Sequence, residues 1–83
     1  MNTKYLEELI EYLLMIDSRT EMENFLRGLL TEKELEELPQ RVQIVKMLKK
    51  GTPQRAIAEE LGIGVGTVTR GSTEIKKGRF RSV

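Results

Sequence analysis

The order of hydrophobic and polar positions predicts an all-α chain. Apolar residues recur three and four positions apart over most of the sequence. This spacing is typical of helices that bury one face. Pro39 should kink or restart the third helix, because proline has no N–H donor and clashes with the preceding turn. We expect helices over about 3–16, 20–29, 31–50, 53–61 and 65–75.

Capping residues mark several of the helix starts. Thr3 can cap the first helix, and Thr31 with Glu34 fits the capping box of the third. Thr52 and Pro53 suit the cap and first position of the fourth helix.

The first helix carries more apolar surface than a small chain easily buries. Its inward stripe is joined by further apolar residues outside the stripe, namely Tyr5, Tyr12, Leu14 and Met15. A partner subunit would cover this surface. The alternative is packing against later helices of the same chain.

Residues 54–72 have the spacing of a helix-turn-helix. Ile57 and Ala58 suit the inner face of a first short helix, and Gly62 suits the left-handed turn that follows. Val65 and Val68 then begin a second apolar face, which leaves small and polar residues outward. A helix of this kind fits the DNA major groove. The alternative is a helical hairpin inside a larger bundle.

Composition and charge narrow the function. The 83 residues suit one domain, with a helical dimerisation and core region over 1–50, the helix-turn-helix over 53–75 and a basic tail over 76–83. The chain has no cysteine or histidine, so we expect no metal site. No apolar run is long enough to cross a membrane, and we expect a cytoplasmic protein.

The charges divide between the two halves of the chain. Residues 1–40 hold four basic and ten acidic groups, whereas residues 41–83 hold ten basic and three acidic groups. The basic half contains the helix-turn-helix and can therefore meet a polyanion. The tail could contact phosphates or be disordered at its end.

Enzymatic chemistry is the least supported function. The glycines at 62, 64 and 66 are mis-spaced for a dinucleotide fingerprint and follow no predicted strand.

Double-stranded DNA is the better-supported partner. We expect phosphate or groove-edge contacts from Gln54, Arg55, Thr67 and Lys76. Val65, Gly66 and Thr69 should lie nearest the bases, and because they donate few hydrogen bonds, readout should use shape or water.

Three segments resemble the tryptophan repressor family of bacterial regulators. They are Leu29-Leu30-Thr31 with Glu34, the run from Arg41 to Gly51, and the helix-turn-helix with its Thr-Val-Thr-Arg-Gly-Ser string at 67–72. The resemblance implies an intertwined helical homodimer. It also implies a DNA-binding repressor of tryptophan biosynthesis or transport genes, with L-tryptophan as corepressor.

The resemblance also implies a ligand site. Arg41 and Arg70 would flank the indole ring, and Arg70 would pair with the ligand carboxylate. Gly71 would leave room for the ring. The other contacts that the resemblance implies are Thr31 to the carboxylate, the carbonyls of Gly28 and Leu30 to the ammonium, and Val45.

Two departures from the family pattern affect these expectations. Glu74 stands where the family often has a serine that helps to hold the ammonium, and a glutamate could do so by charge or could obstruct the site. The family's final helix has no counterpart before Val83, so we expect more of the dimer contact from residues 1–48. Alternatives are a regulator of the same superfamily that answers to another small molecule or to none, and a helical protein-interaction module.

Overall fold

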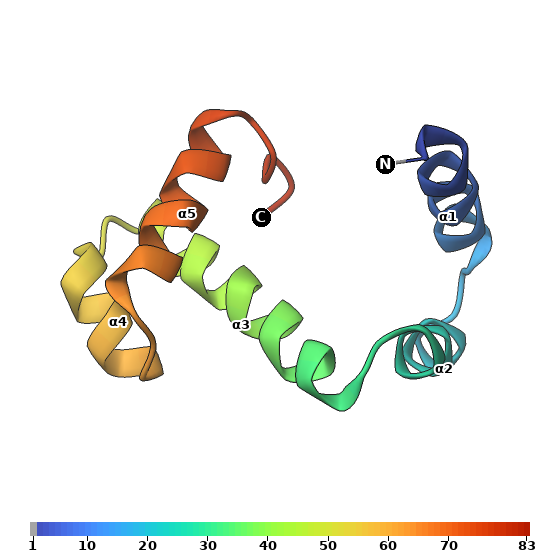
Figure 1. The fold of residues 1–83 in the computed structure, drawn as a ribbon, viewed down its shortest axis with the longest axis horizontal. Coiled ribbons are helices and arrows are strands. Elements are labelled where there is room, and N and C mark those ends of the chain that lie inside the picture. Colours follow the sequence, from blue (N-terminus) through green and yellow to red (C-terminus); the bar gives the residue numbers. More distant parts are fainter. Residues whose placement is uncertain (1) are drawn as a thin grey trace. The chain divides into compact units, whose positions relative to one another are not determined.

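The computed structural model describes residues 2–83, and in this range it contains helices and no strands. The all-α fold class is thus confirmed. The chain divides into two compact units, one ending at Leu35 and one from Glu36 to Val83, and each is described by itself. None of the helices in residues 2–83 is long and apolar enough to cross a membrane. The helices (Figure 1) are α1 (Thr3–Met15), α2 (Arg19–Leu29), α3 (Glu32–Lys49), α4 (Gln54–Leu61) and α5 (Val65–Lys76).

Side-chain caps fix the helix starts in the first unit. The Asn2 side chain accepts hydrogen bonds from the N–H groups of Lys4 and Tyr5, at 3.0 and 3.2 Å. The prediction of Thr3 as this cap was wrong by one position, because asparagine is the stronger capping residue. Thr31 and Glu34 form the predicted capping box, in which each side chain accepts the other's backbone N–H.

Pro39 lies inside α3 and does not interrupt it. The predicted restart at this position was therefore wrong. A proline removes one hydrogen bond from a helix. The capping box holds the helix before Pro39, and the buried side chains of Ile44 and Val45 hold it afterwards.

The second unit contains the hydrophobic core. Ile57 and Ala58 of α4, Val68 of α5 and Ile44 of α3 are buried together. Gly62 ends α4 with a φ of +66°, in the left-handed conformation predicted for it. Pro53 is the cap residue of α4 rather than its first residue, so the predicted start was one residue early. This geometry confirms a helix-turn-helix made by α4 and α5 (Figure 1).

The basic tail folds back as a series of turns, which the sequence did not predict. Gly78 makes the reversal with a φ of +81°. The Lys49 ammonium donates to the carbonyl of Phe80 and, at 2.8 Å, to that of Val83. These contacts attach the tail to the end of α3.

The first unit exposes most of its apolar side chains. No side chain in residues 2–35 is buried. Tyr5, Leu14 and Met15 are each more than 70% exposed, at 73%, 79% and 75%. The excess apolar surface predicted for the first helix is therefore present on α1.

Candidate ligand pocket and nucleic-acid interface

Helix α5 presents three faces, which follow from its 3.6 residues per turn. Val68 lies on the packing face and is fully buried, whereas Val65, which was expected on the same apolar face, is 46% exposed, so that expectation was wrong for Val65. A second face carries Thr67, Arg70 and Glu74, which are spaced three and four positions apart and line a pocket. The third face carries the exposed residues Val65, Thr69 and Lys76, which are four and seven positions apart.

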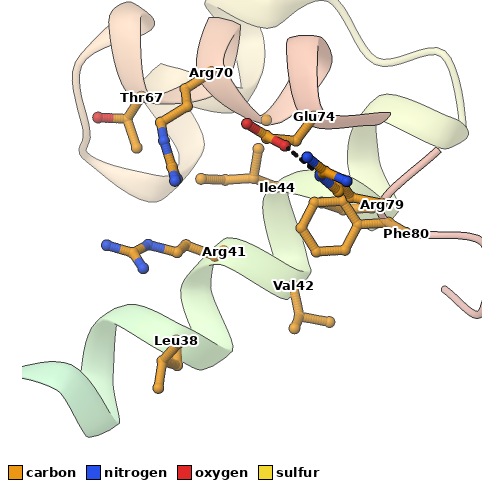
Figure 2. A pocket seen from close by; sticks show the side chains of 11 residues that line it. Leu38, Arg41, Val42, Ile44, Thr67, Arg70, Glu74, Arg79 and Phe80 are labelled. Atoms are coloured by element: carbon orange, nitrogen blue, oxygen red, sulfur yellow. Dashed lines mark hydrogen bonds and ion pairs between the residues drawn. The ribbon is translucent and has the colours of Figure 1, made fainter. Parts of the chain in front are cut away.

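The pocket lies between α3, the second face of α5 and the tail, and has a volume of about 380 Å³. All of it belongs to the second unit. Its volume falls within the range of about 300–1,000 Å³ that is usual for small-molecule sites. The lining combines apolar side chains with four charged ones (Figure 2): Leu38, Arg41, Val42, Ile44, Val45, Thr67, Arg70, Gly71, Glu74, Arg79 and Phe80.

Arg41 and Arg70 both line this pocket, Arg41 from α3 and Arg70 from α5 (Figure 2). Arg41 makes a loose ion pair with Glu37 at 3.8 Å, and its side chain is half exposed. Among residues 2–83, no carboxylate forms an ion pair with Arg70. A guanidinium fork without a partner can bind an incoming carboxylate through two hydrogen bonds.

Gly71 lies where α5 packs closely against α3. A Cβ atom added to Gly71 would lie 3.0 Å from Cγ2 of Ile44 and 3.5 Å from Cδ1 of Leu48. The missing side chain therefore lets α5 approach α3. Space for a ligand ring remains a prediction for this glycine, which also lines the pocket.

Glu74 is the carboxylate of the pocket, and it has two cationic partners in the residues that follow it. Its Oε2 lies 3.3 Å from Nε of Arg79, and its Oε1 lies 3.6 Å from Nζ of Lys77 (Figure 2 shows the Arg79 pair). The Glu74 side chain is 23% exposed, whereas that of Arg79 is 65% exposed. The carboxylate is thus held at the pocket wall by two cations whose side chains face solvent.

The residues predicted to contact DNA gather around the helix-turn-helix, with some unexpected contacts. The Thr69 hydroxyl donates to Oε1 of Gln54 at 2.7 Å and so ties α5 to the start of α4. Gln54 and Thr69 therefore also stabilise the motif itself. Arg55 is exposed, and a Cβ atom added to Gly66 would meet nothing within 4 Å. Thr67 lines the pocket, which the sequence did not indicate.

Three residues of the implied ligand site lie in the first unit. Gly28 is in α2, and Leu30 and Thr31 follow it. Their roles toward a ligand remain predictions. The Thr31 hydroxyl accepts the N–H of Glu34 at 3.2 Å. Its own O–H can still donate to a carboxylate, since a hydroxyl both donates and accepts.

The sequence interpretation missed six lining residues, which are Leu38, Val42, Ile44, Thr67, Arg79 and Phe80. Phe80 could have been predicted from the sequence. An aromatic residue between Arg79 and Arg81 in a charged tail indicates that its ring packs against the rest of the protein. The three α3 residues carried no such signal, since apolar positions in a helix look alike whether they line a core or a pocket.

This lining suits a small molecule with an apolar body and charged ends. Phe80 and the aliphatic side chains offer apolar surface, and the Arg41 and Arg70 guanidiniums can stack on an aromatic face. Arg70 can receive a carboxylate and Glu74 an ammonium. An aromatic α-amino acid fits this set of groups.

The family model and the similar proteins point to the same family. The family described as "Trp repressor protein" matches residues 4–81. A "Trp operon repressor homolog" of Vibrio campbellii is 38% identical over 71 residues, which cover 84% of this chain and 71% of the relative. A protein of the same description from Xylella fastidiosa is 32% identical over 76 residues, covering 90% of this chain and 83% of the relative.

A shorter segment is more similar to another relative. The "Trp operon repressor homolog" of Vibrio vulnificus is 51% identical over 49 residues, which cover 58% of this chain and 48% of the relative. No solved structure matches the chain significantly. The family is one of regulators rather than enzymes. With nearly its whole length matched, the chain belongs to the Trp repressor protein family.

Proposed function

We propose that this chain is a homodimeric DNA-binding repressor of genes for tryptophan biosynthesis or transport, with L-tryptophan as its corepressor. The observation that carries the proposal is the shared pocket, in which Arg41 of α3 and Arg70 of α5 line one cavity beside the helix-turn-helix. Bound tryptophan would supply an aromatic face and a carboxylate between these guanidiniums. The relatives named as Trp operon repressor homologs support the same assignment.

The proposed mechanism is geometric. A dimer meets successive major grooves when its two recognition helices lie about 34 Å apart. Each pocket borders α5, the recognition helix, on the side opposite its outward residues Val65 and Thr69. A ligand that binds one orientation of α5 better than others shifts the population toward that orientation. Tryptophan would therefore raise the affinity for operator DNA.

The outward face of α5 would enter the groove. Val65, Gly66 and Thr69 offer few donors to base edges, so shape and water carry much of the readout. Arg55 at the start of α4 and Lys76 at the end of α5 would bind phosphates, because both are exposed cations. A repressor that works on DNA in this way would act in the cytoplasm of a bacterium.

The test is DNA binding with and without tryptophan. Duplexes selected from a random pool in the presence of L-tryptophan would be used in fluorescence anisotropy. We expect tryptophan to tighten binding at least about fivefold, the lower end of usual allosteric coupling. Affinity should also fall steeply with salt, by a slope of about 0.9 per phosphate contact.

The matched control is Arg55→Ala, which removes an exposed cation outside the pocket. It should weaken DNA binding and reduce the salt slope by about one contact. Its tryptophan affinity should be unchanged. Equal DNA affinity with and without tryptophan would contradict the proposal and favour a regulator that answers to another molecule or to none.

A further inference from the structure

We infer that Arg79 is an internal competitor for the ligand site: it occupies the Glu74 carboxylate until the ammonium of an α-amino acid replaces it. The inference rests on the proposed tryptophan function and concerns how the pocket selects a zwitterion. Its starting point is the Glu74–Arg79 contact at the pocket wall (Figure 2).

The spacing of Arg70 and Glu74 suits both charges of an α-amino acid. The two residues are four positions apart and therefore lie on one face of α5, about 6 Å apart along its axis. Both line the same pocket. A carboxylate bound at Arg70 places the neighbouring ammonium of the ligand toward Glu74. One helical turn can thus receive both ends of the zwitterion.

The contact of Arg79 with Glu74 is one that a ligand ammonium can replace. Its side chain reaches the Glu74 carboxylate through Nε at 3.3 Å, a long contact, while a good charge-assisted hydrogen bond measures about 2.7–2.9 Å. Its side chain is 65% exposed, so it can move into water without being stranded. Arg79 itself lines the pocket, so a bound ammonium would meet its positive charge.

Lys77 provides an internal comparison. It pairs with the same carboxylate at 3.6 Å and carries the same charge as Arg79. It does not line the pocket. Removing Lys77 therefore tests the general effect of a nearby cation, whereas removing Arg79 tests competition inside the pocket.

The experiment compares L-tryptophan with indole-3-propionate, which has the same ring and carboxylate but no ammonium. Calorimetry gives both affinities for the wild type, Arg79→Gln, Lys77→Gln and Glu74→Gln. We expect R79Q to raise the tryptophan affinity severalfold relative to that of indole-3-propionate. K77Q should change this ratio less. E74Q should lower the ratio by about tenfold or more, because a charge-assisted contact is lost.

The outcomes distinguish failure of the proposed tryptophan function from failure of the inference about Arg79. If the wild type binds neither ligand, the proposed function fails and the inference with it. If tryptophan binds the wild type but R79Q leaves the ratio of affinities unchanged, Arg79 does not compete and the inference is overturned. An E74Q variant with an unchanged ratio would show that the ammonium is held elsewhere. Circular dichroism of each variant checks that it is folded.

Discussion

Gly71 is a pocket residue whose missing side chain also sets the packing of α5 on α3. An added Cβ would lie 3.0 Å from the buried side chain of Ile44. Gly66, in the same helix, has nothing within 4 Å of its added Cβ. Replacing either glycine by alanine therefore brings the same gain in helix propensity, but only the change at Gly71 adds a close packing contact.

We predict opposite effects on stability for Gly71→Ala and Gly66→Ala. Gly66→Ala should raise the free energy of unfolding by up to about 1 kcal/mol, the usual gain in a helix. Gly71→Ala should lower it by about 1 kcal/mol, because overpacking costs of about 1–3 kcal/mol exceed that gain. Urea unfolding followed by circular dichroism measures both. Equal stabilisation by the two changes would contradict the packing role of Gly71.

The sequence predicted the place of some pocket residues and not of others. Arg41, Arg70 and Glu74 were assigned to one site by resemblance, and the structure brings them to one pocket. The Glu74–Arg79 pair was not foreseen, because it depends on the reversal of the chain at Gly78. Sequence spacing alone does not specify such a turn when the segment has no helical period.

The turn between α4 and α5 depends on the backbone of Gly62. Its φ of +66° lies in the left-handed region, and the next N–H, of Ile63, bonds to the carbonyl of Ala58 at 3.0 Å. An added Cβ would meet nothing within 4 Å, so backbone strain is the sole cost of a side chain.

We predict that Gly62→Ala lowers the free energy of unfolding by about 1–2 kcal/mol, the cost of a left-handed residue with a Cβ. This corresponds to a fall in Tm of roughly 4–8 °C per kcal/mol for a chain of this size. Gly62→Asn should cost less, because asparagine tolerates this conformation better. Thermal unfolding compares the two. An alanine variant as stable as the wild type would rule out the strain.

Helix positions were predicted well where local chemistry decides them. The capping box of Thr31 and Glu34 and the glycine turn at Gly62 need only neighbouring residues, and both are confirmed. The predicted restart at Pro39 was wrong, because the burial of Ile44 and Val45 outweighs the loss of one local hydrogen bond. The turns of the tail were not predicted for a related reason, since they are held by Lys49, which is far away in the sequence.

The exposed apolar face of α1 bears on the assembly of the whole protein. Leu14 is 79% exposed, and no side chain in residues 2–35 is buried. We propose that a second copy of the chain covers this face, as expected for the family's homodimers. The acidic first half and basic second half of the sequence agree with separate dimerisation and DNA-binding roles.

We predict that Leu14→Glu weakens dimerisation by about tenfold or more, since burying a leucine contributes about 1.5–3 kcal/mol. Sedimentation equilibrium measures the dimer dissociation constant. Glu11→Gln on the same helix is the control and should leave it nearly unchanged, because this change keeps the size of the side chain and removes no apolar surface. A wild type that stays monomeric at micromolar concentrations would contradict the homodimer.

Binding of tryptophan between Arg41 and Arg70 is tested most directly by calorimetric titration of L-tryptophan into the wild type, Arg41→Ala, Arg70→Ala and Arg55→Ala. We expect the wild type and the Arg55 variant, whose change lies outside the pocket, to bind alike. Arg70→Ala should lose about tenfold to a hundredfold in affinity, because an ionic hydrogen bond to the carboxylate is lost. Arg41→Ala should also bind more weakly. A wild type that takes up no tryptophan, or an Arg70 variant that binds as well as the wild type, would contradict the account.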